Sequence, residues 1–162
     1  MKMWNQTILL VEDNEDDVFL MKRALKEADI LNPLQLAVHG QQAVDYLAGT
    51  GEYADRVQYP LPGLIFLDLK LPFKHGLEVL RWIRTQPSLD TILVIVLTSS
   101  SEEFDIRQSY YLGARSFLVK PPTPEMLLEL ILSLKSYWMK FNEFPETPGT
   151  RMPGSQADGV SP

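Results

Sequence analysis

The sequence predicts an α/β protein with a doubly wound parallel sheet, and three observations lead to this fold class. Five short aliphatic runs alternate with five segments of helical periodicity. The runs are apolar at nearly every position, which is typical of strands that are buried on both faces. The chain has 162 residues, enough for one domain with a sizeable core.

Each run and each periodic segment gives one expected element, in chain order. The expected strands are Thr7–Val11, Leu34–Val38, Leu64–Leu67, Ile92–Leu97 and Ser116–Val119. The expected helices are Asp16–Ala28, Gln41–Ala48, Leu77–Thr85, Glu102–Leu112 and about Pro124–Met139. Asn14, followed by three acids, suits the start of the first helix because carboxylates are favoured at a helix N-terminus. Gly76 and Pro124 lie where the third and fifth helices begin.

Two segments have no helical or strand pattern. The connection Gly49–Gly63 is rich in Gly, Tyr and Pro, and loops of that length inside a compact domain are often functional. From about Asn142 onward the chain turns to Pro, Gly, Ser and Thr. We therefore expect one folded domain over residues 6–140 and a flexible tail over 141–162.

The last expected helix is apolar on more than one face. Leu127, Leu130, Ile131, Leu134 and Trp138 form one stripe, and Leu128, Leu132 and Met139 extend a second one. A surface helix needs only one apolar face. The second stripe indicates either a helix that the domain covers deeply or a homodimer surface, and the sequence leaves both alternatives open.

Composition excludes several classes of function. With 15 Lys and Arg against 21 Asp and Glu, the net charge of −6 argues against nucleic acid as a partner. The lack of cysteine excludes disulfides and any cysteine-based zinc site or nucleophile. The first residues have no signal-peptide pattern, and the longest aliphatic run is too short to span a membrane. We expect a soluble, cytoplasmic protein without a membrane partner.

Polar residues that carry chemistry follow four of the five expected strands. In an open α/β sheet, ligands bind beyond the carboxyl ends of the strands. These residues should therefore meet at one edge. They are Glu12 and Asp13 after the first strand, Asp68 after the third, Thr98 and Ser99 after the fourth, and Lys120 after the fifth.

This set suits phosphoryl transfer to a carboxylate. Converging carboxylates repel each other unless a cation lies between them, and Mg²⁺ prefers such oxygen ligands. Asp68 then has an oxygen free to attack a phosphoryl group, while Lys120 and Thr98 offer a positive charge and a hydroxyl donor. Glu15, Asp16 and Asp17 are interpreted as first-turn acids favoured by the helix dipole.

Four stretches carry a resemblance to the response-regulator receiver domains of bacterial two-component signalling, over roughly residues 6–140. They are Ile8–Asp13, Leu64–Pro72 with Gly76, Val96–Ser99 and Phe117–Pro121. The resemblance implies a flavodoxin-like (βα)5 sheet with strand order 2-1-3-4-5. One departure is His75, where an Asp often precedes the glycine of this turn, and we expect its effect to be local.

The resemblance also implies a role for each site residue. Asp68 would be the phospho-acceptor, Asp13 a direct metal ligand, and Glu12 a ligand through water. The backbone carbonyl of Lys70 would contact the metal as well. Thr98 and Phe117 would form the switch pair, and the Lys120–Pro121 bond would be cis. Such a protein is not an enzyme beyond its own phosphorylation and dephosphorylation.

More narrowly, the chain is similar to small stand-alone regulators that partner phytochrome-type sensor kinases. The features are Glu12–Asn14 with Asp16 and Asp17, Gly51–Tyr53 before two prolines, and Tyr137–Trp138. This similarity implies a sensor histidine kinase as partner, with the phytochrome type as the candidate. It also implies a homodimer through the last strand and helix. Phosphorylation would alter the surface of the fourth helix, fifth strand and fifth helix, near which Tyr110 and Tyr111 lie, one of them a candidate core residue.

Three rival functions share the architecture or the strand-end Asp. A haloacid-dehalogenase-type phosphatase needs a second Asp two positions after Asp68, where this chain has Lys70. A flavodoxin-like cofactor carrier needs a Ser/Thr/Gly-rich loop after the first strand, but residues 12–17 are mostly acidic. A phosphorylation-independent receiver-like adaptor is the remaining alternative, and the intact set Asp13, Asp68, Thr98 and Lys120 argues against it.

Overall fold

The computed structural model describes residues 5–141 and 143. It contains a five-stranded parallel sheet in the order β2-β1-β3-β4-β5, which confirms the predicted fold class and strand order. The strands are β1 (Ile8–Val11), β2 (Leu34–Ala37), β3 (Leu64–Leu67), β4 (Leu93–Thr98) and β5 (Ser116–Val119). The α-helices are α1 (Glu15–Glu27), α2 (Gly40–Ala48), α3 (Gly76–Arg84), α4 (Glu103–Tyr111) and α5 (Pro124–Leu134).

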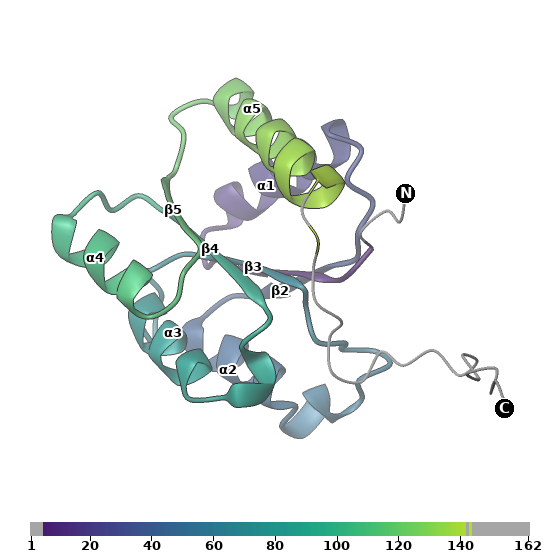
Figure 1. Cartoon of the computed structure of the whole chain (residues 1–162). Coiled ribbons are helices and arrows are strands. Elements are labelled where there is room, and N and C mark those ends of the chain that lie inside the picture. Colours follow the sequence, from purple (N-terminus) through teal and green to yellow (C-terminus); the bar gives the residue numbers. More distant parts are fainter. Residues whose placement is uncertain (1–4, 142, 144–162) are drawn as a thin grey trace, which may run out of the picture.

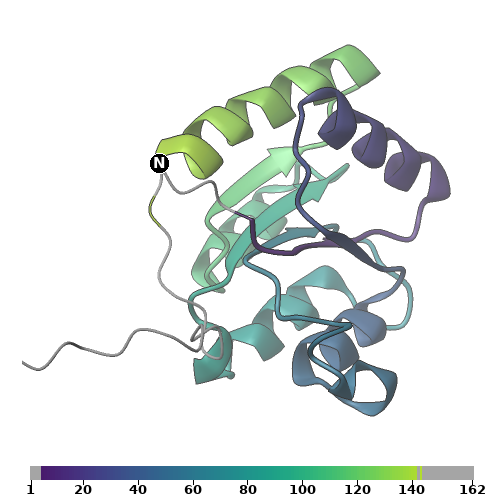
Figure 2. The same ribbon diagram turned by 90° about the vertical axis from the view of Figure 1, so that its right-hand side faces the viewer.

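The helices form a layer on each side of the sheet. Helices α1 and α5 lie on one face and α2, α3 and α4 on the other (Figures 1 and 2). Because side chains alternate along a strand, each central strand feeds both layers. In β1, Leu9 and Val11 join the core with α2 and α3, while Ile8 and Leu10 join the core with α1 and α5. This double burial explains the continuously apolar strand sequences.

Helix α3 begins with a reciprocal cap. The side chain of His75 accepts a hydrogen bond from the Leu77 N–H at 3.1 Å. The Glu78 carboxylate in turn accepts from the His75 N–H at 2.9 Å. The cap satisfies backbone donors that the first turn of a helix leaves unpaired. His75 therefore acts locally, as its place in the sequence predicts.

The connection Gly49–Gly63 is held against the domain rather than free. It contains a short 3₁₀ helix, η1 (Gly51–Ala54). The Arg56 guanidinium donates to the carbonyls of Tyr46 at 2.7 Å, Leu47 at 2.8 Å and Tyr59 at 3.2 Å. Two of these carbonyls, those of Tyr46 and Leu47, lie in the last turn of α2, where a helix offers few backbone donors. Arg56 thus fastens the connection to the C-terminus of α2.

The C-terminal helix is not uniform. The chain is helical over the whole range predicted to about Met139, but only its first part is α-helical: α5 ends at Leu134 and the chain continues as a π-helical segment, η3 (Lys135–Phe141). The change of helix type coincides with a bond from the Lys135 ammonium to the Ala28 carbonyl, at 2.6 Å, where α1 ends. Residues 142 and 144–162, most of the predicted tail, lie outside the described residues.

The two apolar stripes of α5 differ in burial. Leu127 and Ile131 of the first stripe are buried against α1 and the sheet. Leu132 of the second stripe is 46% exposed, and Val119 at the end of β5 is 49% exposed. The helix is therefore not covered on both faces. None of the described helices is both long and apolar enough to cross a bilayer.

The expectation that the Lys120–Pro121 bond is cis is wrong. Every peptide bond in the described part of the chain is trans. Trans is the intrinsically favoured isomer of an X–Pro bond by about 0.5–1 kcal/mol. From this backbone the Lys120 N–H donates to the Thr98 carbonyl at 2.8 Å, and the side chain still reaches the acidic edge of the sheet.

Candidate functional site

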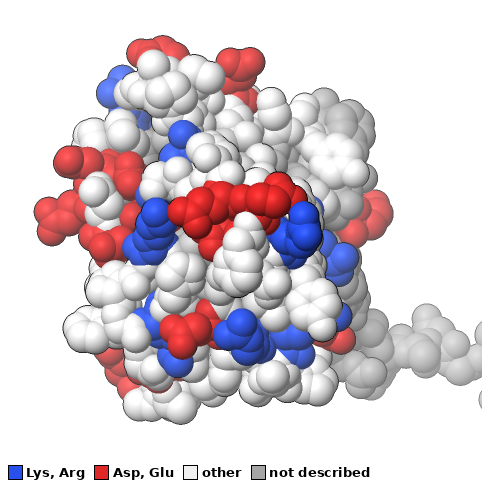
Figure 3. Space-filling view, turned by 90° about the vertical axis from the view of Figure 1, so that its left-hand side faces the viewer, with Lys and Arg blue, Asp and Glu red and all other residues white. Residues whose placement is uncertain are grey.

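The register of the sheet places the strand-end acids at one level. Val11 pairs with Leu67, so Glu12 and Asp68 follow paired residues of neighbouring strands. The Asp68 N–H donates to the Val11 carbonyl at 3.1 Å, which continues the ladder by one bond. Figure 3 shows the molecule from this edge, with acidic side chains gathered at the centre of the face and Lys and Arg on both sides.

Three carboxylates converge at this edge. One carboxylate oxygen each from Glu12, Asp13 and Asp68 lies within 4.8 Å of the others. Glu12 and Asp68 are buried, with 4% and 6% of their surface exposed, while Asp13 is exposed. Buried carboxylates that face each other need a positive partner. All three donors are hard oxygens, so the residues present fit Mg²⁺ or a similar divalent cation.

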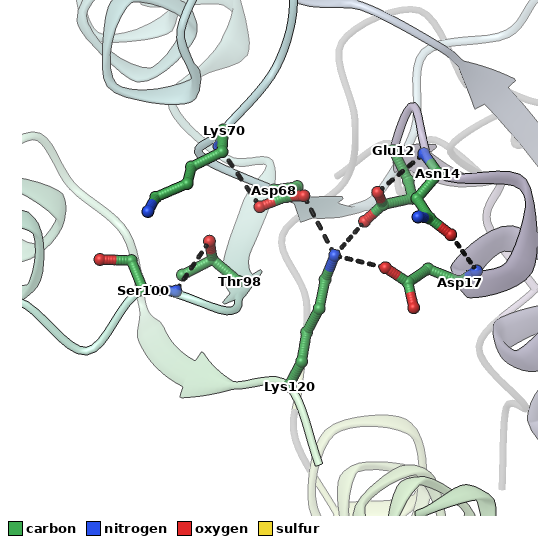
Figure 4. A network of polar contacts seen from close by, with 8 residues as sticks. All are labelled: Glu12, Asn14, Asp17, Asp68, Lys70, Thr98, Ser100 and Lys120. Carbon is green, nitrogen blue, oxygen red and sulfur yellow. Dashed lines mark hydrogen bonds and ion pairs between the residues drawn. The ribbon is translucent and has the colours of Figure 1, made fainter. Parts of the chain in front are cut away.

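Lys120 supplies a fixed positive charge to the same acids. Its ammonium donates to Glu12 at 2.8 Å, Asp17 at 2.8 Å and Asp68 at 3.1 Å (Figure 4). A lysine ammonium has three donors, so each one has a carboxylate partner here. Burial disfavours the charged ammonium, but the hydrogen bonds that it donates to Asp17 and Glu12, together with the charge of Asp68, outweigh this effect. The pKa of Lys120 is therefore raised above its ordinary value.

The site disfavours the ionised form of the Glu12 carboxylate. The pKa of Glu12 is raised to about 7, chiefly because burial disfavours the charged carboxylate and also because the charge of Asp68 lies close by. The hydrogen bond from Lys120 and the Asn14 N–H, which donates to Glu12 at 3.1 Å, act in the opposite direction. Burial prevails because one lysine is shared among several carboxylates. A cation bound here in addition to the Lys120 ammonium would favour the ionised form of Glu12.

The loop after β3 is shaped by a close approach. The Lys70 N–H donates to Asp68 Oδ1 at 3.4 Å, while the Lys70 side chain points away from the carboxylates (Figure 4). The Gly76 N–H donates to the Leu69 carbonyl at 2.7 Å. A Cβ atom at Gly76 would lie 2.4 Å from the Asp68 carbonyl oxygen. Only glycine lets α3 begin this close to the end of β3.

The loop after β4 is tied to α4 by a buried hydrogen bond. Thr98 is completely buried, and the Ser100 N–H donates to its hydroxyl oxygen at 3.5 Å (Figure 4). The Ser100 hydroxyl donates to the buried carboxylate of Asp105 at 2.5 Å. The Ser109 hydroxyl, one turn later, has no partner among the described residues. Helix α4 thus faces the core with polar groups.

The expected switch surface lies beside this loop. Phe117 is half-buried against the core formed with α2 and α3, and its N–H donates to the Tyr110 hydroxyl at 3.2 Å. Tyr110 and Tyr111 are 51% and 78% exposed, so the interpretation of one of them as core is wrong. The inner positions of α4 are taken by Asp105 and Ser109, which leaves both tyrosines outside.

The structure brings most of the predicted residues together and adds one. Glu12, Asp13, Asp68 and Lys120 meet, with Thr98 at the end of β4. The sequence indicates a first-turn acid at Asp17, and the structure shows that Asp17 is also an ion-pair partner of Lys120. Its sequence signal is weak, because only its rotation about the helix axis distinguishes it from Asp16.

Comparisons with known proteins agree on one family. The sequence model described as "Response regulator receiver domain" matches residues 8–132. The response regulator Rcp1 of Synechocystis sp. is 37% identical over 140 residues, which cover 86% of this chain and 93% of Rcp1.

Solved structures agree as well. The phosphorylated cyanobacterial phytochrome response regulator RcpA superposes with a TM-score of 0.81 at 34% identity, covering 88% of this chain and 100% of RcpA. The Mn²⁺-bound form of Rcp1 superposes with a TM-score of 0.79 at 37% identity, covering 87% of this chain and 99% of Rcp1.

Proposed function

The chain belongs to the response regulator receiver family, and from this premise we propose that it accepts a phosphoryl group on Asp68 in a Mg²⁺-dependent reaction. One observation carries the proposal: the buried carboxylate of Asp68 lies beside the Lys120 ammonium and close to the carboxylate oxygens of Glu12 and Asp13. A nucleophile, a cation site and a fixed positive charge are the parts that phosphoryl transfer to a carboxylate requires.

The donor is a phosphohistidine of a sensor histidine kinase. An Asp68 oxygen forms a bond to phosphorus as the bond between phosphorus and the imidazole nitrogen breaks, and the electron pair leaves with the imidazole. Lys120 already donates to Asp68 Oδ2 at 3.1 Å, so its charge is in place for the oxygens of the transferred group. Asp68 Oδ1 accepts a long hydrogen bond, 3.4 Å, from the Lys70 N–H.

The chain's own residues would hold the metal. Asp13 and Asp68 would be its direct carboxylate ligands, Glu12 would bind it through water, and the Lys70 carbonyl would also contact it. When bound, Mg²⁺ screens the carboxylates from the incoming phosphoryl oxygens. The close approach of the three carboxylates supports this assignment, and the relative Rcp1 has a Mn²⁺-bound form.

The response is a change of the α4-β5-α5 surface. Thr98, buried at the end of β4, moves its hydroxyl toward the phosphoryl group, and the half-buried Phe117 turns further inward. This surface exposes Tyr110, Val119 and Leu132. Exposed apolar side chains of this kind suit a protein contact, and we assign a homodimer interface to β5 and α5. The protein acts in the cytoplasm and has no enzyme activity beyond its own phosphorylation and dephosphorylation.

The kinase is of the phytochrome type. RcpA, which is similar over 88% of this chain, is a cyanobacterial phytochrome response regulator, and this likeness supports the assignment. Phosphoryl transfer from a purified phytochrome-type kinase, compared with an unrelated sensor kinase at equal concentration, tests it. Equal transfer rates from both kinases would contradict it. Sedimentation velocity with and without phosphorylation measures the dimer.

The acceptor role is tested by incubation with Mg²⁺ and a small acyl phosphate, followed by intact-mass measurement. We expect one added phosphoryl group on the wild type and none on Asp68→Asn or in a chelator. The matched control Asp16→Asn removes the same charge from an exposed first-turn position and should be labelled like the wild type. No uptake by a folded, metal-bound protein would favour the phosphorylation-independent adaptor instead.

A further inference from the structure

One contact of the site belongs neither to the metal ligands nor to the acceptor: the ion pair between Asp17 and Lys120, at 2.8 Å. We propose that Asp17 is a positioning residue, which holds the Lys120 ammonium in the orientation that phosphoryl transfer to Asp68 needs. The inference rests on the proposed function, because it concerns the same reaction.

Asp17 reaches Lys120 from a different layer than the other two acids. Glu12 and Asp68 follow β1 and β3, whereas Asp17 lies in the first turn of α1. Its backbone is fixed there, since the Asp17 N–H donates to the Asn14 side chain at 3.0 Å. The side chain of Asp17 is 38% exposed, against 5% and 6% for Glu12 and Asp68. Asp17 is therefore the most exposed of the three partners of the ammonium.

A lysine needs such an anchor. Its charge lies at the end of a flexible four-carbon stem, and a donor without a protein acceptor turns toward water. The three donors of Lys120 are matched by three carboxylates before transfer. After transfer, a phosphoryl oxygen replaces the Asp68 oxygen, and Glu12 and Asp17 keep the other two donors. Asp17 can thus orient the ammonium in both states without breaking a bond.

The competing explanation is that Asp17 only complements the helix dipole. Glu15 and Asp16 occupy the same first turn and carry the same charge. Asp16 is exposed and makes no ion pair with Lys120 in the described structure. Replacement of Asp16 therefore removes an equal charge from the same helix end without touching the lysine.

The first experiment compares phosphorylation rates of the wild type, Asp17→Ala, Asp17→Asn and Asp16→Ala over a range of acyl phosphate concentrations at saturating Mg²⁺. We expect Asp17→Ala to lower the maximal rate by roughly tenfold, because misplaced groups slow transfer more than they weaken donor binding. Asp17→Asn, which keeps an acceptor oxygen, should lose less. Asp16→Ala should stay within about twofold of the wild type, as expected for a surface charge screened by water. Equal effects at both positions would overturn the positioning role.

A second measurement does not depend on phosphorylation. Proton–nitrogen spectra of the lysine ammonium groups, with the Lys120 signal assigned from Lys120→Arg, report whether the ammonium is shielded from water. We expect the signal in the wild type and in Asp16→Ala, and its loss in Asp17→Ala. A signal that is unchanged in Asp17→Ala would overturn the inference. Urea denaturation shows whether each variant is folded.

The two experiments distinguish a failure of the proposed role of Asp17 from a failure of the proposed function. Uptake by the wild type and by Asp17→Ala at the same rate would leave the acceptor assignment intact and refute the role of Asp17. A wild type that takes up no phosphoryl group would refute the proposed function and the transfer role with it. In that case the ammonium signal still decides whether Asp17 holds Lys120.

Discussion

Replacement of Glu12 by glutamine should stabilise the metal-free protein above neutral pH. Glu12 is buried beside Asp68, and its pKa rises from 4.5 to about 7 on folding. The folded state therefore favours the protonated acid. The contribution of Glu12 to stability is fully present below pH 4.5 and is lost as the pH rises through about 7.

The size of the effect follows from the pKa. A difference of one in pKa corresponds to about 1.4 kcal/mol. The rise from 4.5 to about 7 is thus worth about 3 kcal/mol of unfolding free energy. At pH 8 the Glu12→Gln variant should exceed the wild type by this amount, which corresponds to roughly 6–12 °C in Tm for a domain of this size. Near pH 4.5 the two should be nearly equal.

Urea denaturation in EDTA at several pH values between 4.5 and 8 measures the difference. The control Glu15→Gln changes an exposed acid of the same region and should follow the wild type at every pH. Saturating Mg²⁺ should shrink the advantage of Glu12→Gln, because a bound cation stabilises the ionised carboxylate. Parallel pH profiles for the wild type and Glu12→Gln would refute the reasoning.

Three further substitutions test individual side-chain hydrogen bonds of the domain by urea denaturation at saturating Mg²⁺. Ser100→Ala should cost about 1–3 kcal/mol, because it leaves the buried Asp105 carboxylate without its hydroxyl donor. Arg56→Lys should cost about 1–2 kcal/mol, because an ammonium cannot reproduce the planar fork that serves three carbonyls. His75→Ala should cost about 1 kcal/mol by removing the cap of α3, whereas His75→Asp should retain most of the stability.

For each of these substitutions, one result would contradict the reason given for the loss of stability. Ser101→Ala, an exposed neighbour, should change stability by less than about 0.5 kcal/mol, and an equal loss at Ser100 and Ser101 would deny the bond to Asp105. Full stability of Arg56→Lys would show that charge alone fastens the connection. An equal loss in His75→Ala and His75→Asp would show that the imidazole ring packs rather than caps.

The fold could be predicted because strands buried on both faces leave a plain pattern. The runs Leu64–Leu67 and Ser116–Val119 have the bounds that the sequence predicts, and the others differ by a residue or so at their ends. The convergence of Glu12, Asp68 and Lys120 was also predictable, since the carboxyl ends of parallel strands meet at one edge.

The remaining features depend on tertiary contacts, which no local sequence pattern predicts. Asp17 and Asp105 both look like first-turn acids, and only the rotation of each helix shows which partner it meets. The isomer of the Lys120–Pro121 bond depends on a free-energy difference of about 1 kcal/mol, which tertiary context easily decides. The π-helical end of the last helix begins at Lys135, whose ammonium donates to the Ala28 carbonyl at the end of α1.

Helix α1 is held at its start by Lys120 and just past its end by Lys135, and these partners lie 103 and 107 residues further along the chain. Both contacts close very long loops, whose entropy must be lost before either bond forms. Such contacts raise the contact order of the chain and slow its folding. During synthesis, α1 leaves the ribosome long before the lysines that anchor it. The first helix to be made is thus among the last to be fastened.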